Sequence, residues 1–442
     1  MLINGDEMLP ALLQDIRAAR SSIHISMFLW FHDSVGKEVT EAVIQRAREG
    51  VTVRVLLNVE KTAMGDPFST GEKQMMKLDS SMTEDPHDVE PMCRAMRAAG
   101  IQVNDTNIDY DHVPSAAEPR LHSLAAQIRA TIAVDDLHVD HRKVIVIDGQ
   151  VGYCGGANIG VQYMYHEAFD PKQDARVEAE TRKREGRPEP WLKWHDSLTR
   201  FAGPVVDELE QHFHDRFVLD GGPEYTLAPV DHEQPPAELA QLTQALGSLP
   251  IADAKVYCNE PSDQPNAVRE LYLRLIREAR QSIFIENPYF YHPPLVEALC
   301  QAKQQRPELE VTLVLPAKDW NDNAFALDAQ QHEYARYLEQ GIDVYEYRCH
   351  FNHLKLAVFD ARWSIHGSTN GNFRSLEDDK DFELVVLVDD EPFARSLLTR
   401  VRDPDVAHAR QITAADLGHS LEGFRIRHRD PRTMLLLSRR EL

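Results

Sequence analysis

Two short segments of the chain carry the same reactive side chains at the same spacing. The first contains His141 and Lys143 within HVDHRKVIVID, and the second contains His353 and Lys355 within HFNHLKLAVFD. Residues i and i+2 of a β-strand face the same side, so each imidazole and its neighbouring ammonium group converge on one point. A histidine can act as nucleophile or general acid, and a lysine can bind an anion. Each pair therefore predicts chemistry on a phosphate group.

A turn of small residues that ends in asparagine follows each segment, GGAN at 155–158 and GSTN at 367–370. Glycine allows the backbone to approach a ligand closely, and the amide of Asn158 or Asn370 can donate to a phosphoryl oxygen. If the two half-sites meet, two histidines, two lysines and two asparagines surround one phosphate.

An aspartate also follows each lysine, Asp148 in the first segment and Asp360 in the second. Each stands seven residues after its histidine, on the opposite strand parity, and directly before Gly149 or Ala361. This spacing favours a role in the turn over a role in the chemistry.

An ordinary strand edge is the alternative interpretation of a His-x-Lys pattern, and a single copy would favour it. Two copies with identical spacing, each followed by a small-residue turn that ends in asparagine, favour a functional site instead.

The elements that must position these residues are themselves duplicated. Residues 18–25 (AARSSIHI) match residues 278–285 (EARQSIFI), and the same offset aligns VTVRVL at 51–56 with VTLVLP at 311–316. Each match combines an amphipathic helical pattern with strands of alternating or continuous Val, Ile and Leu, which predicts a βαβ unit used twice. We expect two α/β halves, each a mixed sheet flanked by helices, with the active site at their junction.

Composition suggests where the halves begin and end. A polar stretch rich in glycine and proline predicts a linker at 219–252, between a first domain at 1–218 and a second at 253–442. Three further stretches have no counterpart in the repeat and are expected to be insertions: 59–95, 104–137 and 170–190.

The charge balance excludes some partners. The formal net charge is −23, which is opposite to the basic surface of a nonspecific nucleic-acid binder. No apolar run approaches the roughly 18 residues of a membrane span, and the N-terminus lacks the pattern of a signal peptide. The five cysteines are scattered and fit neither a disulfide framework nor a CxxC metal site. These features predict a soluble or peripheral protein of a reducing compartment.

The duplicated motif resembles that of the phospholipase D superfamily, which is marked by HxKxxxxD followed by a GG- or GS-x-N turn. Within it the chain is most similar to bacterial cardiolipin synthases, through GGANIG at 155–160, WHD at 194–196, Pro-Tyr-Phe at 288–290 and GSTNGNFRSL at 367–376. The resemblance implies two phospholipase D-like α-β-α sandwich halves that form an intramolecular pseudo-dimer.

The resemblance also implies a two-step displacement through a phosphohistidine. His141 is assigned as the nucleophile and His353 as the general acid, with the reverse order left open. The phosphate would be held by Lys143, Lys355, Asn158, Asn370, Gly156 and Ser368, and the motif aspartates Asp148 and Asp360 complete the family's catalytic set. No metal and no other cofactor is implied.

In this family a downstream carboxylate orients each catalytic histidine and supports its imidazolium form. Asp196 of WHD is expected to orient His141, and Asp381 of DDKDFEL is expected to orient His353. Glu383 lies on the same strand parity as Asp381 and is the alternative partner for His353.

The function expected from the resemblance is phosphatidyl transfer between phospholipids, as in a cardiolipin synthase, with phosphatidylglycerol as donor and acceptor. The alternatives are hydrolysis, as in a phospholipase D or a nuclease, and a catalytically silent lipid-binding module. The acidic net charge disfavours the nuclease, and two intact motifs disfavour the silent module. A phospholipid is the expected partner, with no nucleic acid and with peripheral contact at the cytoplasmic face of the inner membrane.

Overall fold

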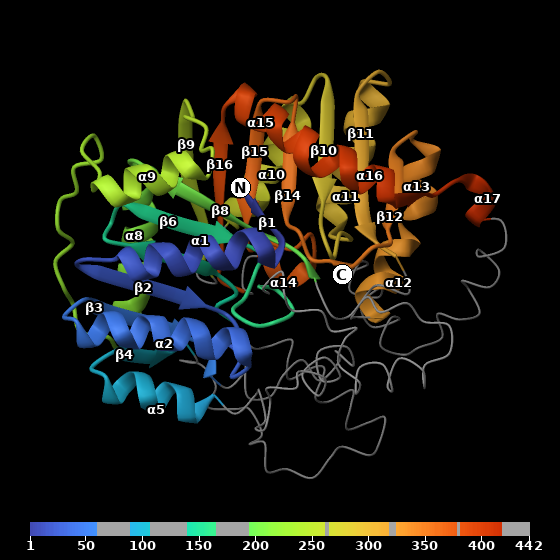
Figure 1. The fold of residues 1–442 in the computed structure, drawn as a ribbon. Coiled ribbons are helices and arrows are strands. Elements are labelled where there is room, and N and C mark those ends of the chain that lie inside the picture. The colour runs from blue at the N-terminus through green and yellow to red at the C-terminus, as the bar shows by residue number, and fades with distance from the viewer. Residues whose placement is uncertain are drawn as a thin grey trace, which may run out of the picture.

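The computed structural model describes residues 1–59, 89–106, 139–164, 194–260, 265–317, 324–377 and 381–417. The predicted insertion 170–190 lies outside the described residues, as do most of 59–95 and 104–137. Figure 1 shows two α/β halves side by side, the first coloured blue to green and the second yellow to red.

A seven-stranded mixed sheet forms the centre of the first half, in the order β1-β8-β6-β5-β2-β3-β4. Strands β2, β3 and β4 are parallel, and β5, β6 and β8 are antiparallel to their neighbours. The strand bounds are β1 Leu2–Ile3, β2 Ser22–Met27, β3 Thr52–Leu57, β4 Gln102–Asp105, β5 Lys143–Ile147, β6 Val151–Gly155 and β8 Ser197–Ala202. Its helices are α1 Asn4–Ala18, α2 Ser34–Arg48, α5 Glu90–Ala98 and α8 Val205–Leu219.

The second half repeats this plan in an eight-stranded sheet with the order β17-β12-β11-β10-β14-β15-β16-β9. Its strands are β9 Asp253–Asn259, β10 Ser282–Glu286, β11 Glu310–Pro316, β12 Asp343–Tyr347, β14 Leu356–Phe359, β15 Trp363–Gly367, β16 Glu383–Asp389 and β17 Ala409–Gln411. Its helices are α10 Ala267–Glu278, α11 Pro293–Gln305, α12 Ala324–His332, α13 Tyr334–Glu339, α14 Phe373–Leu376, α15 Glu391–Leu397, α16 Asp403–His408 and α17 Ala414–Leu417, with a π-helical turn at Leu398–Arg402.

The duplication expected from the sequence is confirmed in the order of the strands. The matched segments form β2 and β3 in one half and β10 and β11 in the other, and both pairs are parallel. In each half the strand that follows the His-x-Lys motif, β5 or β14, lies antiparallel to the first matched strand. The predicted linker 219–252 contains helix α9, Ala237–Ala245, which packs beside α1. The domain boundaries themselves stay a prediction.

A hydrophobic cluster shared by both halves holds them together. It includes Val144 and Val146 of β5, Leu356 and Val358 of β14, and Val386 of β16, all buried. Full burial of one such side chain contributes about 1.5–3 kcal/mol. Each half also has a hydrophobic cluster of its own, built on α1, α2 and β2 or on α10, α11 and β10. Across the junction, β6 of the first half lies against β15 and β16 of the second.

Two short backbone pairings cross the junction between the halves. Strand β7, Trp194–His195, pairs in parallel with β13, Phe351–Asn352, and Asp140 forms a parallel bridge with Phe382. The two pairings are equivalent, because each joins the residue before a motif histidine to a segment of the opposite half.

Within the ranges described above, no helix combines the length and the apolar character that a membrane crossing requires.

Candidate active site

The two motif histidines stand just before their strands, whereas the sequence pattern placed them on the strands. β5 begins at Lys143, and β14 begins only after Lys355. The backbone N–H of His141 donates to the carbonyl of Phe382 at 3.0 Å, and that of His353 donates to the carbonyl of His195 at 2.8 Å. Both histidines are thus anchored to the opposite half of the molecule. Their own strands begin only after them.

Each motif lysine folds back onto its own histidine. Lys143 Nζ donates to the carbonyl of His141 at 2.6 Å, and Lys355 Nζ donates to the carbonyl of His353 at 2.8 Å. Lys355 Nζ also lies 2.9 Å from Nε2 of His353. Burial lowers the pKa of Lys143 to about 8, against the opposing effect of Glu383 and Asp196. Both ammonium groups are therefore buried next to their histidines, and that of Lys355 lies beside the ring nitrogens.

The charges of both motifs act on both histidines, as expected if the two half-sites form one site. Burial lowers the pKa of His141, and Lys143 and the opposite motif's Lys355 lower it further, while Glu383 raises it. Burial lowers the pKa of His353 well below its ordinary value, and Lys355, Lys143 and His141 add to the effect. In the absence of substrate, burial and the two lysines therefore favour the uncharged form of both rings.

Glu383 is the carboxylate that contacts His141. Its Oε1 lies 2.9 Å from His141 Nδ1, and it also accepts from the hydroxyls of Ser368 and Ser375. Burial would raise the pKa of Glu383, but His141, Lys143 and the bond from Ser368 hold that pKa below its ordinary value. Glu383 therefore remains ionised.

Asp196 is the carboxylate that contacts His353. Its Oδ2 lies 2.6 Å from His353 Nδ1, and its Oδ1 accepts from the backbone N–H of Ser197 at 2.8 Å. Burial raises the pKa of Asp196 to about 7, against the opposing charge of Lys355. Asp196 is therefore more easily protonated than Glu383, whose pKa lies below its ordinary value.

The carboxylate assignment made from the sequence is wrong in both halves, because the pairs are crossed. Asp196 was expected beside His141, and Asp381 beside His353. The bridge between Asp140 and Phe382 instead brings the next residue, Glu383, to His141. In the same way β7 and β13 bring Asp196 to His353.

Asp381 has another role, since it forms an ion pair with Arg374, with Oδ2 3.0 Å from Nε, and accepts from the N–H of Val139 at 3.2 Å. The strand parity of Glu383 had indicated that it could orient a catalytic histidine. From the sequence it was assigned to His353, whereas it contacts His141.

The motif aspartates close turns and lie away from the histidines. Asp148 accepts from the backbone N–H groups of residues 20–22, and Asp360 accepts from those of residues 280–282. Both adopt left-handed backbone conformations, with φ of 56° and 51°. The turn role expected from parity is confirmed, and the family-based inclusion of these residues in the catalytic set is corrected.

Two of the predicted phosphate ligands serve the carboxylates instead. Ser368 donates its hydroxyl to Glu383. The N–H of Gly156 donates to the carbonyl of Ser197 at 3.1 Å, and a Cβ on Gly156 would lie 2.3 Å from Asp196 Oδ1. Gly156 is therefore required by the close approach of Asp196.

The two asparagines lie where the sequence placed them, at the ends of the small-residue turns, and both are buried. Asn158 Oδ1 accepts from the N–H of Leu29 at 3.1 Å, which fixes the orientation of the amide. Asn370 donates its backbone N–H to Ser375 Oγ at 3.1 Å, and its Oδ1 has no hydrogen-bond partner among the described residues. Their contact with phosphate stays a prediction.

Gly156→Ala tests the tight packing around Asp196. The added methyl group would overlap Asp196 Oδ1 and lie 3.0 Å from Lys355 Cδ, so the carboxylate must move away from His353. We expect kcat to fall about 100-fold, as for a misplacement of roughly 1 Å, with a loss of about 1–3 kcal/mol in stability. Steady-state kinetics and thermal unfolding measure the two effects. Wild-type kcat in this variant would contradict the described packing.

Aromatic rings wall the site, and of these Tyr163 and Trp194 were not predicted as site residues. Phe28 lies edge-on to His141 with ring centroids 4.8 Å apart, and Lys143 Nζ lies 4.8 Å from the Phe28 centroid. The ring of His353 is 5.0 Å from Trp194 and 5.5 Å from Tyr163. Segments 27–31 and 288–291 are mostly buried, with Phe28 and Tyr289 only half-buried.

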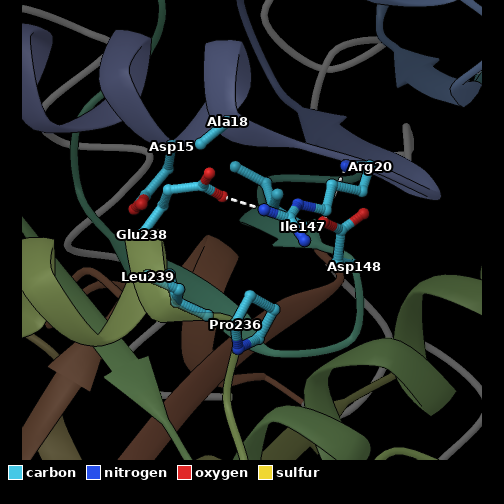
Figure 2. Close-up of a pocket in the computed structure, with 8 residues that line it drawn as sticks. All are labelled: Asp15, Ala18, Arg20, Ile147, Asp148, Pro236, Glu238 and Leu239. Carbon is cyan, nitrogen blue, oxygen red and sulfur yellow. Dashed lines mark hydrogen bonds and ion pairs between the residues drawn. The ribbon is translucent and has the colours of Figure 1, made fainter.

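A crevice between α1, the Asp148 turn and α9 lies apart from the histidines, at the other end of β5 (Figure 2). Arg20 and Glu238 form an ion pair across it. Its volume is about 20 Å³, enough for a water molecule and too small for a substrate.

Comparisons with known proteins match most of the chain. A family model described as "Cardiolipin synthase, PLD-like domain" matches residues 12–170 and 272–402. Cardiolipin synthase 1 of Bacillus anthracis is 23% identical over 417 residues, which are 93% of this chain and 67% of that protein. Cardiolipin synthase A of Pectobacterium atrosepticum is 26% identical over 416 residues, which are 94% of this chain and 70% of that protein. The chain thus spans about two thirds of the length of these curated relatives.

A solved structure shares the fold. The crystal structure of a phosphatidylserine synthase from Haemophilus influenzae aligns with a TM-score of 0.58 at 16% identity, and the alignment covers 92% of this chain and 86% of that one. The two-half α/β architecture expected from the repeats is therefore found in a protein of known structure.

Proposed function

This chain belongs to the cardiolipin synthase family of phospholipase D-like domains, and we propose that it transfers a phosphatidyl group from one phospholipid to another. Phosphatidylglycerol serves as donor and as acceptor, and the products are cardiolipin and glycerol. The main support is the pair of buried histidine–carboxylate dyads, His141 with Glu383 and His353 with Asp196. Phosphodiester exchange needs a nucleophile and a proton donor at the same phosphorus, and two such dyads supply both.

The first step forms a phosphohistidine. His141 Nε2 attacks phosphorus while its Nδ1–H donates to Glu383, and the bond from phosphorus to the glycerol oxygen breaks. The proton held by the His353–Asp196 pair, in which burial raises the pKa of Asp196 to about 7, passes through His353 Nε2 to that oxygen, so glycerol leaves as a neutral alcohol. Lys143 and Lys355 stabilise the charge that grows on the nonbridging oxygens, and the amides of Asn158 and Asn370 assist.

The second step regenerates the enzyme. The terminal hydroxyl of a second phosphatidylglycerol gives its proton to His353 and attacks phosphorus. The bond from phosphorus to Nε2 of His141 then breaks, and cardiolipin is released. The reaction exchanges one phosphodiester for another, so excess glycerol reverses it.

The difference between the dyads favours His141 as the nucleophile. A phosphorylated imidazole that keeps its Nδ1 proton is a cation, and the ionised Glu383 beside His141 stabilises it. The general acid must gain and lose a proton within each cycle. His353 has a lowered pKa, and its partner Asp196 has a pKa of about 7, which suits that exchange.

The same proposal includes peripheral contact with a membrane, because both substrates are membrane lipids. We place the protein at the cytoplasmic face of the inner membrane. The net charge of −23 opposes binding to anionic lipid, so contact requires apolar anchors or a locally positive face.

The products made from phosphatidylglycerol test the transferase function against hydrolysis. Water at about 55 M outcompetes an alcohol unless the site excludes water and orients the acceptor, an advantage that orientation can make very large. The aromatic walls formed by Phe28, Tyr163 and Trp194 supply such an environment. We expect mass spectrometry of the lipids to show mainly cardiolipin, with phosphatidic acid a minor product.

Added glycerol should convert cardiolipin back to phosphatidylglycerol. A preparation that makes mostly phosphatidic acid at saturating lipid, and incorporates no added alcohol, would instead be a phospholipase D-type hydrolase.

A further inference from the structure

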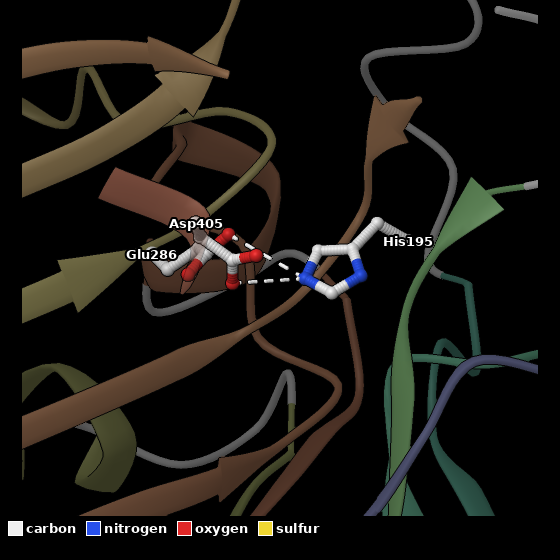
Figure 3. A group of neighbouring side chains, drawn as sticks. All are labelled: His195, Glu286 and Asp405. Atoms are coloured by element: carbon white, nitrogen blue, oxygen red, sulfur yellow. Dashed lines mark hydrogen bonds and ion pairs between the residues drawn. The ribbon is translucent and has the colours of Figure 1, made fainter. Parts of the chain in front are cut away.

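A buried cluster of His195, Glu286 and Asp405 lies behind the active site and has no role in the steps described above. One ligand atom from each residue lies within 4.8 Å of the others (Figure 3). His195 Nε2 is 3.0 Å from Asp405 Oδ2 and 3.9 Å from Glu286 Oε1. The three residues come from β7 of the first half and from β10 and α16 of the second. The cluster therefore spans the junction between the halves.

The hydrogen bonds of His195 leave one ring nitrogen directed at two carboxylates. Its Nδ1 is 2.8 Å from Asn4 Oδ1, an acceptor, so the proton of a neutral ring lies on Nδ1 and the lone pair on Nε2. That lone pair faces the oxygens of Glu286 and Asp405 (Figure 3). Acceptors that face one another repel unless a proton or a metal ion lies between them, and the 3.0 Å contact of Nε2 with Asp405 accommodates either. A ring nitrogen that donates to an oxygen while the other faces outward is also the usual arrangement of a metal-binding histidine.

Glu286 is not fully satisfied by the protein. Its side chain is fully buried, and its Oε1 accepts from Asn352 Nδ2 at 2.6 Å. Its Oε2 is buried with no hydrogen-bond partner. No lysine or arginine of the described segments forms an ion pair with Glu286 or Asp405. Two buried carboxylates whose basic neighbour among the described residues is one histidine require a shared proton or a bound cation.

We propose that His195, Glu286 and Asp405 bind a divalent transition-metal ion, with Zn²⁺ as the best match. Imidazole nitrogen and carboxylate oxygen are both ligand atoms that zinc accepts, and the Oε2 of Glu286 offers a fourth donor. Mg²⁺ fits less well, because it keeps several waters and prefers oxygen ligands alone. This inference does not depend on the proposed function.

The ion is structural, because it lies on the other side of the backbone from the phosphate. Side chains alternate along a strand, so His195 and Asn352 face away from Asp196 and His353, their neighbours in the chain. Asn352 holds Glu286, and Asn4 donates its backbone N–H to the carbonyl of Asp196 at 2.8 Å. The ion would thus fix the β7–β13 pair that brings Asp196 to His353, and it would join the two halves.

Metal analysis of the purified full-length chain tests the proposal. The protein is stripped with a chelator, loaded with Zn²⁺, freed of excess metal and analysed by atomic emission. We expect one equivalent per chain and a rise in the unfolding temperature on loading, because an ion bound only by the folded state stabilises it. The variants His195→Gln and Asp405→Asn should no longer bind the equivalent of zinc. Asn4→Ala should weaken binding about 10- to 100-fold, as expected when a metal-bound histidine loses its outer partner.

His24→Gln is the matched control. His24 is a buried histidine paired with one carboxylate, Glu210, so its loss should leave the zinc content unchanged. Co²⁺ loading provides a second measurement: nitrogen and oxygen ligands give visible bands without thiolate charge transfer. Three results would overturn the proposal: a folded wild-type chain that binds no zinc, binding that survives in both ligand variants, or a thiolate spectrum. A folded wild-type chain without zinc would show that Glu286 and Asp405 share a proton instead.

Discussion

His141→Ala and His353→Ala should each reduce turnover of phosphatidylglycerol by at least about 10³-fold. Loss of the nucleophile removes the covalent route, and loss of the general acid leaves a poor alkoxide leaving group; one proton-transfer group alone contributes about 10²–10⁴-fold. A phosphorylated intermediate should form only when His141 is present. Rapid quench followed by mass spectrometry of peptides locates it, provided acid is avoided during work-up.

Folding should survive these substitutions, since both rings line the site and neither belongs to a hydrophobic cluster. His214→Ala is the control, because His214 is a partly buried histidine of α8 that forms no contact with the motifs. Phosphate found on His353 would contradict the assignment of the two roles. Activity comparable to wild type in either alanine variant would show that the duplicated motif is not the active site.

The sequence was sufficient for features that depend on local spacing. The repeat predicted β2, β3, β10 and β11 because buried parallel strands read as runs of Val, Ile and Leu. The parity of Asp148 predicted its turn role, because strand side chains alternate strictly. The partners of the Asp148 carboxylate, the N–H groups of residues 20–22, were not predicted, because they lie 126 to 128 residues away.

The partners of the histidines depended on how the two halves meet, which local spacing does not encode. Glu383 is 242 residues from His141, and Asp196 is 157 residues from His353. Their contacts follow from the Asp140–Phe382 bridge and from the β7–β13 pair, neither of which has a hydrophobic pattern of its own. Gly156 was misassigned for a related reason: the neighbour that requires glycine there, Asp196, comes from another strand segment.

The crossed dyads predict which histidine responds to each carboxylate. Glu383→Gln removes a charge that raises the pKa of His141, so that pKa should fall further while the pKa of His353 changes little. Asp196→Asn should instead alter the titration of His353, whose Nδ1 it contacts at 2.6 Å. Titration of ¹⁵N-labelled imidazoles followed by NMR measures both. If the pairing were parallel, Asp196→Asn would change His141.

The same two variants should lose activity heavily and in different ways. Each should lower kcat by about 10²–10⁴-fold, because a histidine without its carboxylate loses its tautomer and the support of its cationic form. His141 attacks as the neutral ring, so a lower pKa in Glu383→Gln keeps it neutral to more acidic pH and moves the acid limb of kcat/KM downward. The variant still reacts slowly there, since the phosphoimidazolium has lost its counter-charge.

Asp381→Asn is the control and should lower kcat less than tenfold, because Asp381 binds Arg374 and the backbone of Val139 rather than either histidine. A loss in Asp381→Asn as large as in Glu383→Gln would restore the pairing expected from the sequence.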